Sequence, residues 1–221
     1  MTLDFSPVLE SWRFLLGGLG LTLLLAASTV VCSLVLGGTV GLARCYGPAW
    51  LRAPLVFYID SMRAVPVLVV LVWTYFALPI VTGAVLPPFW AALAALSAHI
   101  GAYVAEIVRA GVSSIRPGQT RAALALGMSR AQAVRDVVLP QAIVRMLPAF
   151  GSIISIAIKD TAIATVIAVP EYMNRSQTLA GESFHPIEVF LTAMAVYFII
   201  LFPVTRAVDM IYVRLAHLGR S

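Results

Sequence analysis

Long uncharged, apolar stretches dominate the chain, and their lengths predict membrane-spanning helices. The run from Phe14 to Ala43 contains 30 residues without a charge, enough for a tilted helix to cross a hydrocarbon core of ~30 Å. The next run, Ala64 to Ala98, has 35 uncharged residues, and prolines and a glycine divide it into two spans with a tight turn. Apolar character returns after Met146 and again after Ile187. The pattern predicts an all-α integral membrane protein, one transmembrane domain over residues 1–221, with five spans at 14–43, 54–78, 86–110, 146–169 and 187–208.

Composition excludes a soluble protein. Hydrophobic residues make up 61% of the 221 residues, charged residues only 11%, and the mean hydropathy is +0.96, whereas soluble domains are about 25% charged. The only lysine, Lys159, follows Ile158, so the chain has no Gly-Lys pair and no P-loop for ATP. Cys32 and Cys45 lack the spacing of a metal site, and we expect both to be small core residues. We expect no metal site and no catalytic residues.

The basic residues predict the orientation of the spans. The net charge is +5, from 15 Lys and Arg against 10 Asp and Glu. With the N-terminus outside, 11 arginines fall on the cytoplasmic side, against Arg13 and Arg175 outside, while Arg63 and Lys159 lie within spans. Cytoplasmic loops carry the excess of basic residues in membrane proteins. The distribution therefore predicts N-out, C-in, rather than a nucleic-acid-binding surface. The 11 arginines are Arg44, Arg52, Arg109, Arg116, Arg121, Arg130, Arg135, Arg145, Arg206, Arg214 and Arg220.

A less apolar cytoplasmic segment, residues 111–140, separates the third and fourth spans. Pro117 and Gly118 predict a turn, Gln119–Leu126 a short helix, and Gly127 the residue that ends it. Ser129 with Gln132 forms a capping box that opens a second helix, which we expect to stop near Pro140. Such a helix-turn-helix could bind DNA or lie on the membrane surface. The smooth Ala-rich face of the first helix favours insertion into a groove of a partner protein.

The spacing of this segment resembles the cytoplasmic EAA loop of bacterial ABC importer permeases. Ala122 and Ala123 are followed by Gly127 and then by Leu139-Pro140. Further stretches extend the likeness to the polar amino acid family, and within it to glutamate/aspartate permeases. These are Ala102–Gly111, Gly118–Ala142, Lys159–Thr161, and Arg63–Pro66, where the family commonly has Arg-Gly-Thr-Pro.

The resemblance implies a transporter subunit, not an enzyme, in the bacterial inner membrane. Its implied partners are a second permease chain, identical or homologous, two ATPase subunits, an extracytoplasmic substrate-binding protein, an amino-acid substrate and membrane lipid, but no nucleic acid. ATP and Mg²⁺ would be bound by the ATPase, so this chain itself would hold no cofactor. The implied ATPase-coupling residues are Gln119, Arg121, Ala122, Ala123, Gly127, Leu139 and Pro140. Arg121 departs from the motif, which has an acidic residue there, so an ion pair of the family at this position cannot be carried over.

Ionisable residues within the predicted spans are candidates for the substrate path. Charges inside a membrane cost ~2.5–3.5 kcal/mol on insertion scales and usually face a bundle interior or a polar path. Arg63 and Lys159 lie at similar depths and suggest one shared site, in which a cation binds the α-carboxylate of an amino acid and an acid binds its α-ammonium group. Asp60 with Arg63, and Glu106 with Arg109, could instead be structural pairs. The candidates are Arg63, Glu106, Lys159, Asp160 and Thr161. Pro66 should loosen the helix just beyond Arg63.

The sequence thus predicts an importer subunit for a polar, possibly acidic, amino acid that works by alternating access. An ion-coupled secondary transporter or channel is the alternative, with Asp60, Glu106 and Asp160 as ion sites. That alternative would act without an ATPase, and it leaves the cytoplasmic helix-turn-helix without a role.

Overall fold

The computed structural model describes residues 3–218, and every regular element among them is a helix. Arg220, one of the residues in the topology count, lies outside this range. The all-α expectation is confirmed for the described part of the chain. The α-helices are α1 (Ser6–Glu10), α2 (Trp12–Tyr46), α3 (Ala49–Ala64), α4 (Val67–Val72), α5 (Leu78–Thr82), α6 (Pro88–Ser113), α7 (Pro117–Ala125), α8 (Arg130–Gln132), α9 (Leu139–Asp160), α10 (Tyr172–Ser183) and α11 (Pro186–Leu218). Two π-helical segments, Trp73–Ala77 and Ala133–Val138, and one 3-10 segment, Thr161–Ile167, join some of them.

Four helical stretches are long and apolar enough to cross a membrane, by length and composition: Trp12–Tyr46, Pro88–Ser113, Arg130–Ile167 and Pro186–Val208. A fifth candidate is a pair of helices, Ala49–Ala64 and Val67–Thr82, which meet at an angle of 110°. Each of the five predicted spans overlaps one of these stretches. The number that cross the membrane and the N-out, C-in direction stay predictions.

The sharp bend in the second candidate span lies at Pro66. Val65 and Pro66 are extended, with ψ of 135° and 137°, and helical geometry resumes at Val67. A residue before proline disfavours the helical region, and proline offers no N–H to continue the helix. α3 therefore ends at Ala64, directly after Arg63. The expectation that Pro66 loosens the helix just beyond Arg63 is confirmed.

The central helix pair, α2 and α6, packs through small residues. Without Cβ atoms, Gly37 and Gly41 of α2 allow close approach: a Cβ on Gly41 would lie 2.7 Å from Val108 Cβ and 2.8 Å from the Ala105 carbonyl oxygen of α6. Helices in membranes associate through such small-residue faces because lipid supplies no hydrophobic drive between them. The buried residues of α2 are mostly small: Gly18, Thr22, Ala26, Thr29, Ser33, Gly37 and Gly41, with Leu15 and Leu25 as the large ones.

The segment that joins α6 to α9 corrects two predictions. Pro117 and Gly118, predicted as a turn, are the first two residues of α7, where proline lacks only an N–H that would be unpaired anyway. Pro140, predicted to end a helix, is the second residue of α9, and the helical stretch continues from Arg130 to Ile167. The π-helical segment Ala133–Val138 changes the hydrogen-bond register before Pro140, which accommodates the proline inside a continuous helix.

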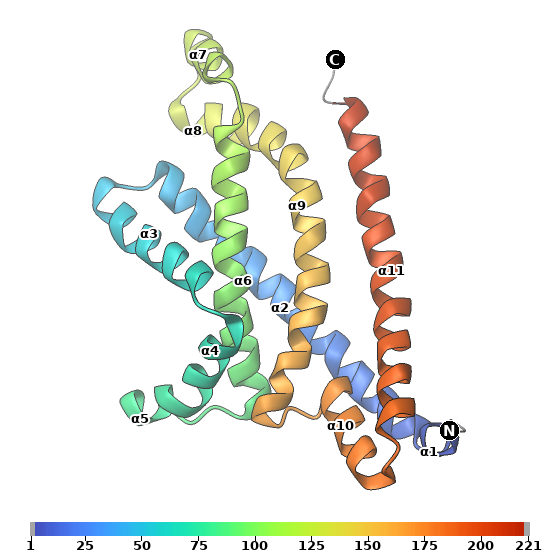
Figure 1. Ribbon diagram of the computed structural model, residues 1–221. Helices are drawn as coiled ribbons and strands as arrows, with labels where there is room; N and C mark the ends of the chain where they lie inside the picture. The colour runs from blue at the N-terminus through green and yellow to red at the C-terminus, as the bar shows by residue number, and fades with distance from the viewer. Residues whose placement is uncertain (1–2, 219–221) are drawn as a thin grey trace.

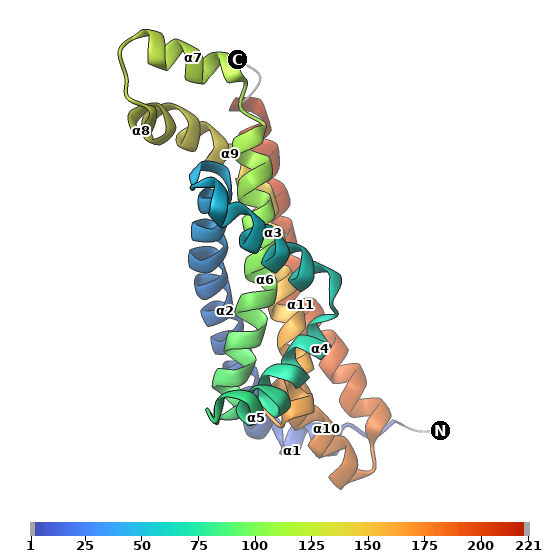
Figure 2. The same cartoon turned by 90° about the vertical axis from the view of Figure 1, so that its left-hand side faces the viewer.

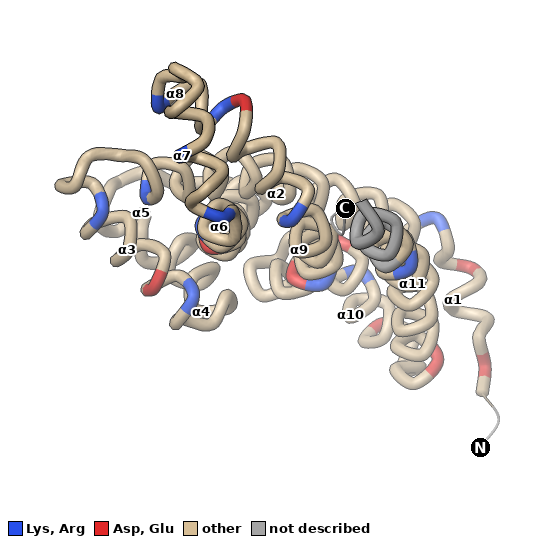
Figure 3. Tube along the Cα trace, turned by 90° about the horizontal axis from the view of Figure 1, so that it is seen from above, with Lys and Arg blue, Asp and Glu red and all other residues tan. Residues whose placement is uncertain are grey.

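The helices form a thin wall. α3, α6, α9 and α11 stand roughly in a row, and α2 crosses behind them (Figures 1 and 3). α7 and α8 project beyond one end of the row, which we call the coupling end, whereas α1, α5 and α10 lie at the opposite end (Figures 1 and 2). We call this opposite end the outer end, after the predicted N-out orientation. Cys32 is exposed and Cys45 partly exposed on this wall, so the prediction that both are core residues is wrong. A wall this thin leaves both flanks of most helices open to lipid or to another chain.

Candidate functional site

Arg63 lines a groove on one face of the wall, near the middle of its height. The groove has a volume of about 330 Å³ and lies between the end of α3, the second half of α6 and α9. The Arg63 guanidinium carbon lies 5.7 Å from the centre of the Tyr103 ring, a cation–π contact. The groove is lined by Arg63, Tyr103, Glu106, Ile107, Ala110, Ala149, Ser152, Ile153 and Ile156. Two of the predicted substrate-path residues, Arg63 and Glu106, are thus brought to one hollow.

Glu106 is tied to two arginines. Arg44 Nη1 of α2 donates to Glu106 Oε2 at 2.8 Å, and Arg109 Nε donates to Oε1 at 2.9 Å. The pairing with Arg109, one helical turn away, matches the structural alternative for this residue, while Arg44 had not been foreseen. Both carboxylate oxygens are engaged, so Glu106 joins α2 to α6 at the edge of the groove.

Asp60 and Arg63 do not neutralise each other. No ion pair joins them within residues 3–218, and both side chains are exposed. The alternative that they form a structural pair is therefore wrong for this conformation. The Arg63 guanidinium stays without a carboxylate within 4.0 Å in the described chain, which leaves it able to bind an anion.

Lys159, Asp160 and Thr161 lie where α9 passes into the 3-10 segment Thr161–Ile167. The Lys159 side chain is exposed and that of Asp160 half-buried. Thr161 is buried, and its hydroxyl donates to the Ile158 carbonyl oxygen at 2.8 Å, so it is satisfied within its own helix. Lys159 and Asp160 are not among the residues that line the groove, which reaches along α9 as far as Ile156.

The coupling helix α7 presents a different face from the predicted one. Ala123 is only 4% exposed because it turns towards the segment Ala133–Val138, whereas Leu126 is 82% exposed. The prediction that Ala123 belongs to a docking face is therefore wrong, and its small side chain instead lets α7 pack closely on the chain. Gln119, Arg121 and Ala122 are exposed.

The turn after α7 forms as predicted. Gly127 has a φ of +83°, which glycine adopts without strain. The Ser129 hydroxyl accepts from Gln132 N at 3.3 Å, and the Gln132 side chain accepts from Ser129 N at 2.8 Å, so the capping box is present. Leu139 is partly exposed and Pro140 exposed where this second helix continues into α9. α7 therefore packs against its own chain through Ala123 and leaves its opposite face exposed at the coupling end.

A buried carboxylate at the outer end was missed by the sequence reasoning. Glu171 is fully buried, caps α10 by accepting from Met173 N at 2.9 Å and Asn174 N at 2.7 Å, and accepts a hydrogen bond from the Thr22 hydroxyl of α2 at 3.1 Å. The Tyr197 hydroxyl of α11 lies 3.5 Å from the same carboxylate. An acid just after proline and before a helix is an N-cap signal that could have identified it. Glu171 joins three helices with no cation within 4.0 Å among the described residues.

This arrangement predicts a pH-dependent stability. Burial raises the pKa of the Glu171 carboxyl above its ordinary value, although its hydrogen bonds oppose the shift. The folded state then holds the proton more tightly than the unfolded state, so stability is greatest below the unfolded pKa of about 4.3 and falls as the pH rises through the raised folded pKa. Glu171→Gln, which keeps an acceptor for the cap, should flatten this decline in thermal unfolding measured against pH.

The matched control is Glu182→Gln, because Glu182 lies on the same helix but is exposed. That variant should keep the pH dependence of the parent protein. An unchanged decline in Glu171→Gln would show that another group carries the dependence.

Taken together, a wall of apolar spanning helices, a mostly apolar groove that carries Arg63 and Glu106, and an exposed helix α7 at one end are the features of a membrane transport subunit. Residues 33–217 match the family described as "Binding-protein-dependent transport system inner membrane component". The chain belongs to this family. It is a multi-pass protein of the bacterial inner membrane and not an enzyme, since ATP hydrolysis in such transporters resides in a separate subunit.

Individual relatives confirm the resemblance to the polar amino acid permeases. The octopine permease OccM of Rhizobium radiobacter is 36% identical, over 93% of this chain and 87% of its own length. The glutamine permease GlnP of Escherichia coli (strain K12) is 37% identical, over 91% and 92%. A crystal structure of an amino acid ABC transporter with histidines superposes with a TM-score of 0.89 at 30% identity, over 97% of this chain and 100% of that one. The methionine transporter MetNI, at 20% identity and a TM-score of 0.79 over 93% and 98% of the two chains, shares the fold.

Proposed function

We propose that this chain is one of two permease subunits of an importer for a polar amino acid. The second permease subunit is a copy of this chain or a homologue. Two ATPase subunits, which bind ATP and Mg²⁺, dock at the coupling end. A substrate-binding protein delivers the amino acid at the outer end. The single observation that carries the proposal is the combination of the groove at Arg63 with the exposed coupling helix α7 on one chain of this family.

The chemistry of the groove favours an amino acid as cargo. Arg63 has no carboxylate partner within 4.0 Å among the described side chains, and a guanidinium binds a carboxylate through charge-assisted, often paired, hydrogen bonds. The α-ammonium group needs an acceptor, for which Asp160 is the nearest candidate along α9 beyond the groove, because both oxygens of Glu106 are already engaged. In this proposal Lys159 and Asp160 contact the substrate only after the permease changes conformation or pairs with its second subunit.

The substrates for which the relatives are named differ widely in their side chains. The relatives are named for octopine, glutamine, arginine and cystine, which share the amino-acid groups and differ in side-chain charge. We therefore propose a polar substrate, with acidic amino acids among the candidates, recognised by this chain through its α-groups. Selection among side chains belongs mainly to the binding protein.

Reconstitution tests the proposal directly. The chain is placed in proteoliposomes alone, and together with its ATPase and binding protein, and ATP-dependent uptake of radiolabelled glutamine and glutamate is measured. Uptake should require all the components and ATP. Uptake by the chain without an ATPase would contradict the proposal and favour an ion-coupled transporter.

In the same proteoliposomes, Arg63→Gln should lower substrate-stimulated uptake about 10- to 150-fold, because a hydrogen bond to a charged group contributes ~1.5–3 kcal/mol. Basal ATP hydrolysis should stay close to that of the parent protein, because Arg63 makes no ion pair that holds the fold. The control is Asp60→Asn, one turn earlier on α3 and outside the groove lining. Equal losses of uptake and basal hydrolysis in Arg63→Gln would indicate a structural role instead.

A further inference from the structure

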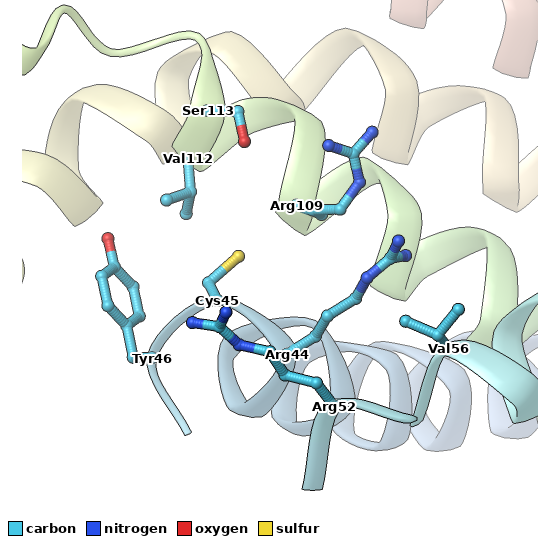
Figure 4. Close-up of a pocket in the computed structure, with 8 residues that line it drawn as sticks. All are labelled: Arg44, Cys45, Tyr46, Arg52, Val56, Arg109, Val112 and Ser113. Atoms are coloured by element: carbon cyan, nitrogen blue, oxygen red, sulfur yellow. The ribbon is translucent and has the colours of Figure 1, made fainter. Parts of the chain in front are cut away.

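A second hollow lies at the coupling end, away from the substrate groove. It is an open depression with a volume of about 370 Å³, lined by the last turn of α2, the first turns of α3 and the end of α6. Figure 4 shows its lining, to which all three helices contribute. The residues are Arg44, Cys45, Tyr46, Arg52, Val56, Arg109, Val112 and Ser113.

This hollow carries excess positive charge. Three arginines line it, and among the described side chains the only acid paired with any of them is Glu106, which binds Arg44 and Arg109. Arg52 is exposed and has no carboxylate within 4.0 Å in the described chain. In Figure 4 Arg44 and Arg109 point to one side of the hollow, whereas Arg52 extends to the other, towards Tyr46. Three positive charges against one negative charge leave the site with a net charge of +2.

The groups in the hollow suit a phosphate ester. Arginine presents a planar fork of N–H donors that matches phosphate oxygens. The hydroxyls of Tyr46 and Ser113 are further donors on the lining. Arg52 lies in the first turn of α3, where the helix dipole adds positive potential.

The surroundings point to a lipid as the source of the phosphate. Trp50 and Phe57 lie on the same helix α3 as Arg52, and each is 75% exposed. An exposed tryptophan and an arginine in the same terminal turn of an apolar span are typical of headgroup depth in a membrane. Anionic lipids of the cytoplasmic leaflet attract basic residues at this depth.

We propose that this hollow binds the phosphate headgroup of an anionic phospholipid in the leaflet at the coupling end. Arg52 is the main ligand, with the Tyr46 hydroxyl on the side towards which it extends, while Arg44 and Arg109 add positive charge to the lining. The acyl chains lie along the apolar surface of α3, to which Trp50 and Phe57 belong.

The site also adjoins the coupling helix. A neighbouring hollow of about 570 Å³ shares Tyr46, Val112 and Ser113 with it and continues to Thr120 and Arg121 of α7. A bound headgroup therefore braces the α2–α3 turn against the segment that leads into α7. This consequence for coupling rests on the proposed function, whereas lipid binding does not.

The test uses the full chain in nanodiscs of phosphatidylcholine with increasing phosphatidylglycerol, and native mass spectrometry counts the phosphatidylglycerol molecules retained. Arg52→Gln should weaken retention about fivefold, the effect of one basic residue near an anionic surface. The matched control is Arg206→Gln, because Arg206 is an exposed arginine of α11 that does not line the hollow, and this variant should retain lipid like the parent protein.

Equal retention by Arg52→Gln and the parent protein would overturn the proposal, as would an equal loss in Arg206→Gln, which would indicate diffuse attraction. Free glycerol phosphate is added as a competitor, and displacement of the lipid by it at equal concentration would identify a site for a soluble anion instead. Because the measurement needs no ATPase and no substrate, its failure would leave the proposed transport function untouched.

Discussion

Leu126→Asp should abolish binding of the ATPase while leaving the permease folded. Leu126 follows α7 directly and is 82% exposed at the coupling end, although a large apolar side chain gains ~1.5–3 kcal/mol when it is buried. A partner that covers it would supply that burial. A carboxylate at this position would lose the gain and add the desolvation of a charge, so the affinity should fall by at least about 100-fold.

Co-purification of the ATPase with tagged permease, and ATPase activity stimulated by the permease, measure the effect. Because the side chain touches little of its own chain, the thermal unfolding of the permease alone should not change. Ala131→Asp is the matched control, since it places the same charge on an exposed position of α8 instead of α7. Retained co-purification of Leu126→Asp would show that the ATPase engages another face.

A substitution at Ala123 would not test docking, because Ala123 is buried against its own chain. The sequence places Ala122 and Ala123 together in the motif, but neighbours on a helix point about 100° apart. The structure turns Ala123 inwards, so Ala123→Asp would bury a charge against Ala133–Val138 and report misfolding rather than docking. The motif identifies the helix, whereas only tertiary packing shows which of its faces is free.

Elsewhere in the chain, too, the sequence predicts local features, whereas tertiary packing determines the contacts between helices. Span lengths, the bend at Pro66, the turn at Gly127 and the capping box depend on neighbouring residues, so the sequence predicts them. The pairing of Arg44 with Glu106 and of Thr22 with Glu171 joins residues that are 62 and 149 positions apart, and only the packing of α2 creates these pairs. The prediction that a helix ends near Pro140 is wrong because the π-helical segment Ala133–Val138 accommodates the proline within a continuous helix.

The packing of α2 on α6 supports the strongest prediction for stability. Gly37→Val should lower the free energy of unfolding by about 3 kcal/mol or more, because overpacking of a tight contact has costs of this order. A Cβ at Gly37 would lie 2.5 Å from Val104 Cβ and closer still to the Gly101 carbonyl oxygen, which is backbone and cannot rotate away. For a protein of this size, the loss corresponds to a fall of about 6–12 °C in Tm.

The neighbouring glycine provides the control. A Cβ at Gly38 would have no atom within 4 Å outside its own helix, so Gly38→Val makes the same chemical change without the clash. Valine has a slightly better helix propensity than glycine, so Gly38→Val should be neutral or mildly stabilising. Thermal unfolding of both variants in the same detergent separates the two effects. Similar Tm values for Gly37→Val and Gly38→Val would mean that α2 and α6 can separate cheaply, and hence that the link from Arg44 to Glu106, rather than the glycine contact, sets the position of α2.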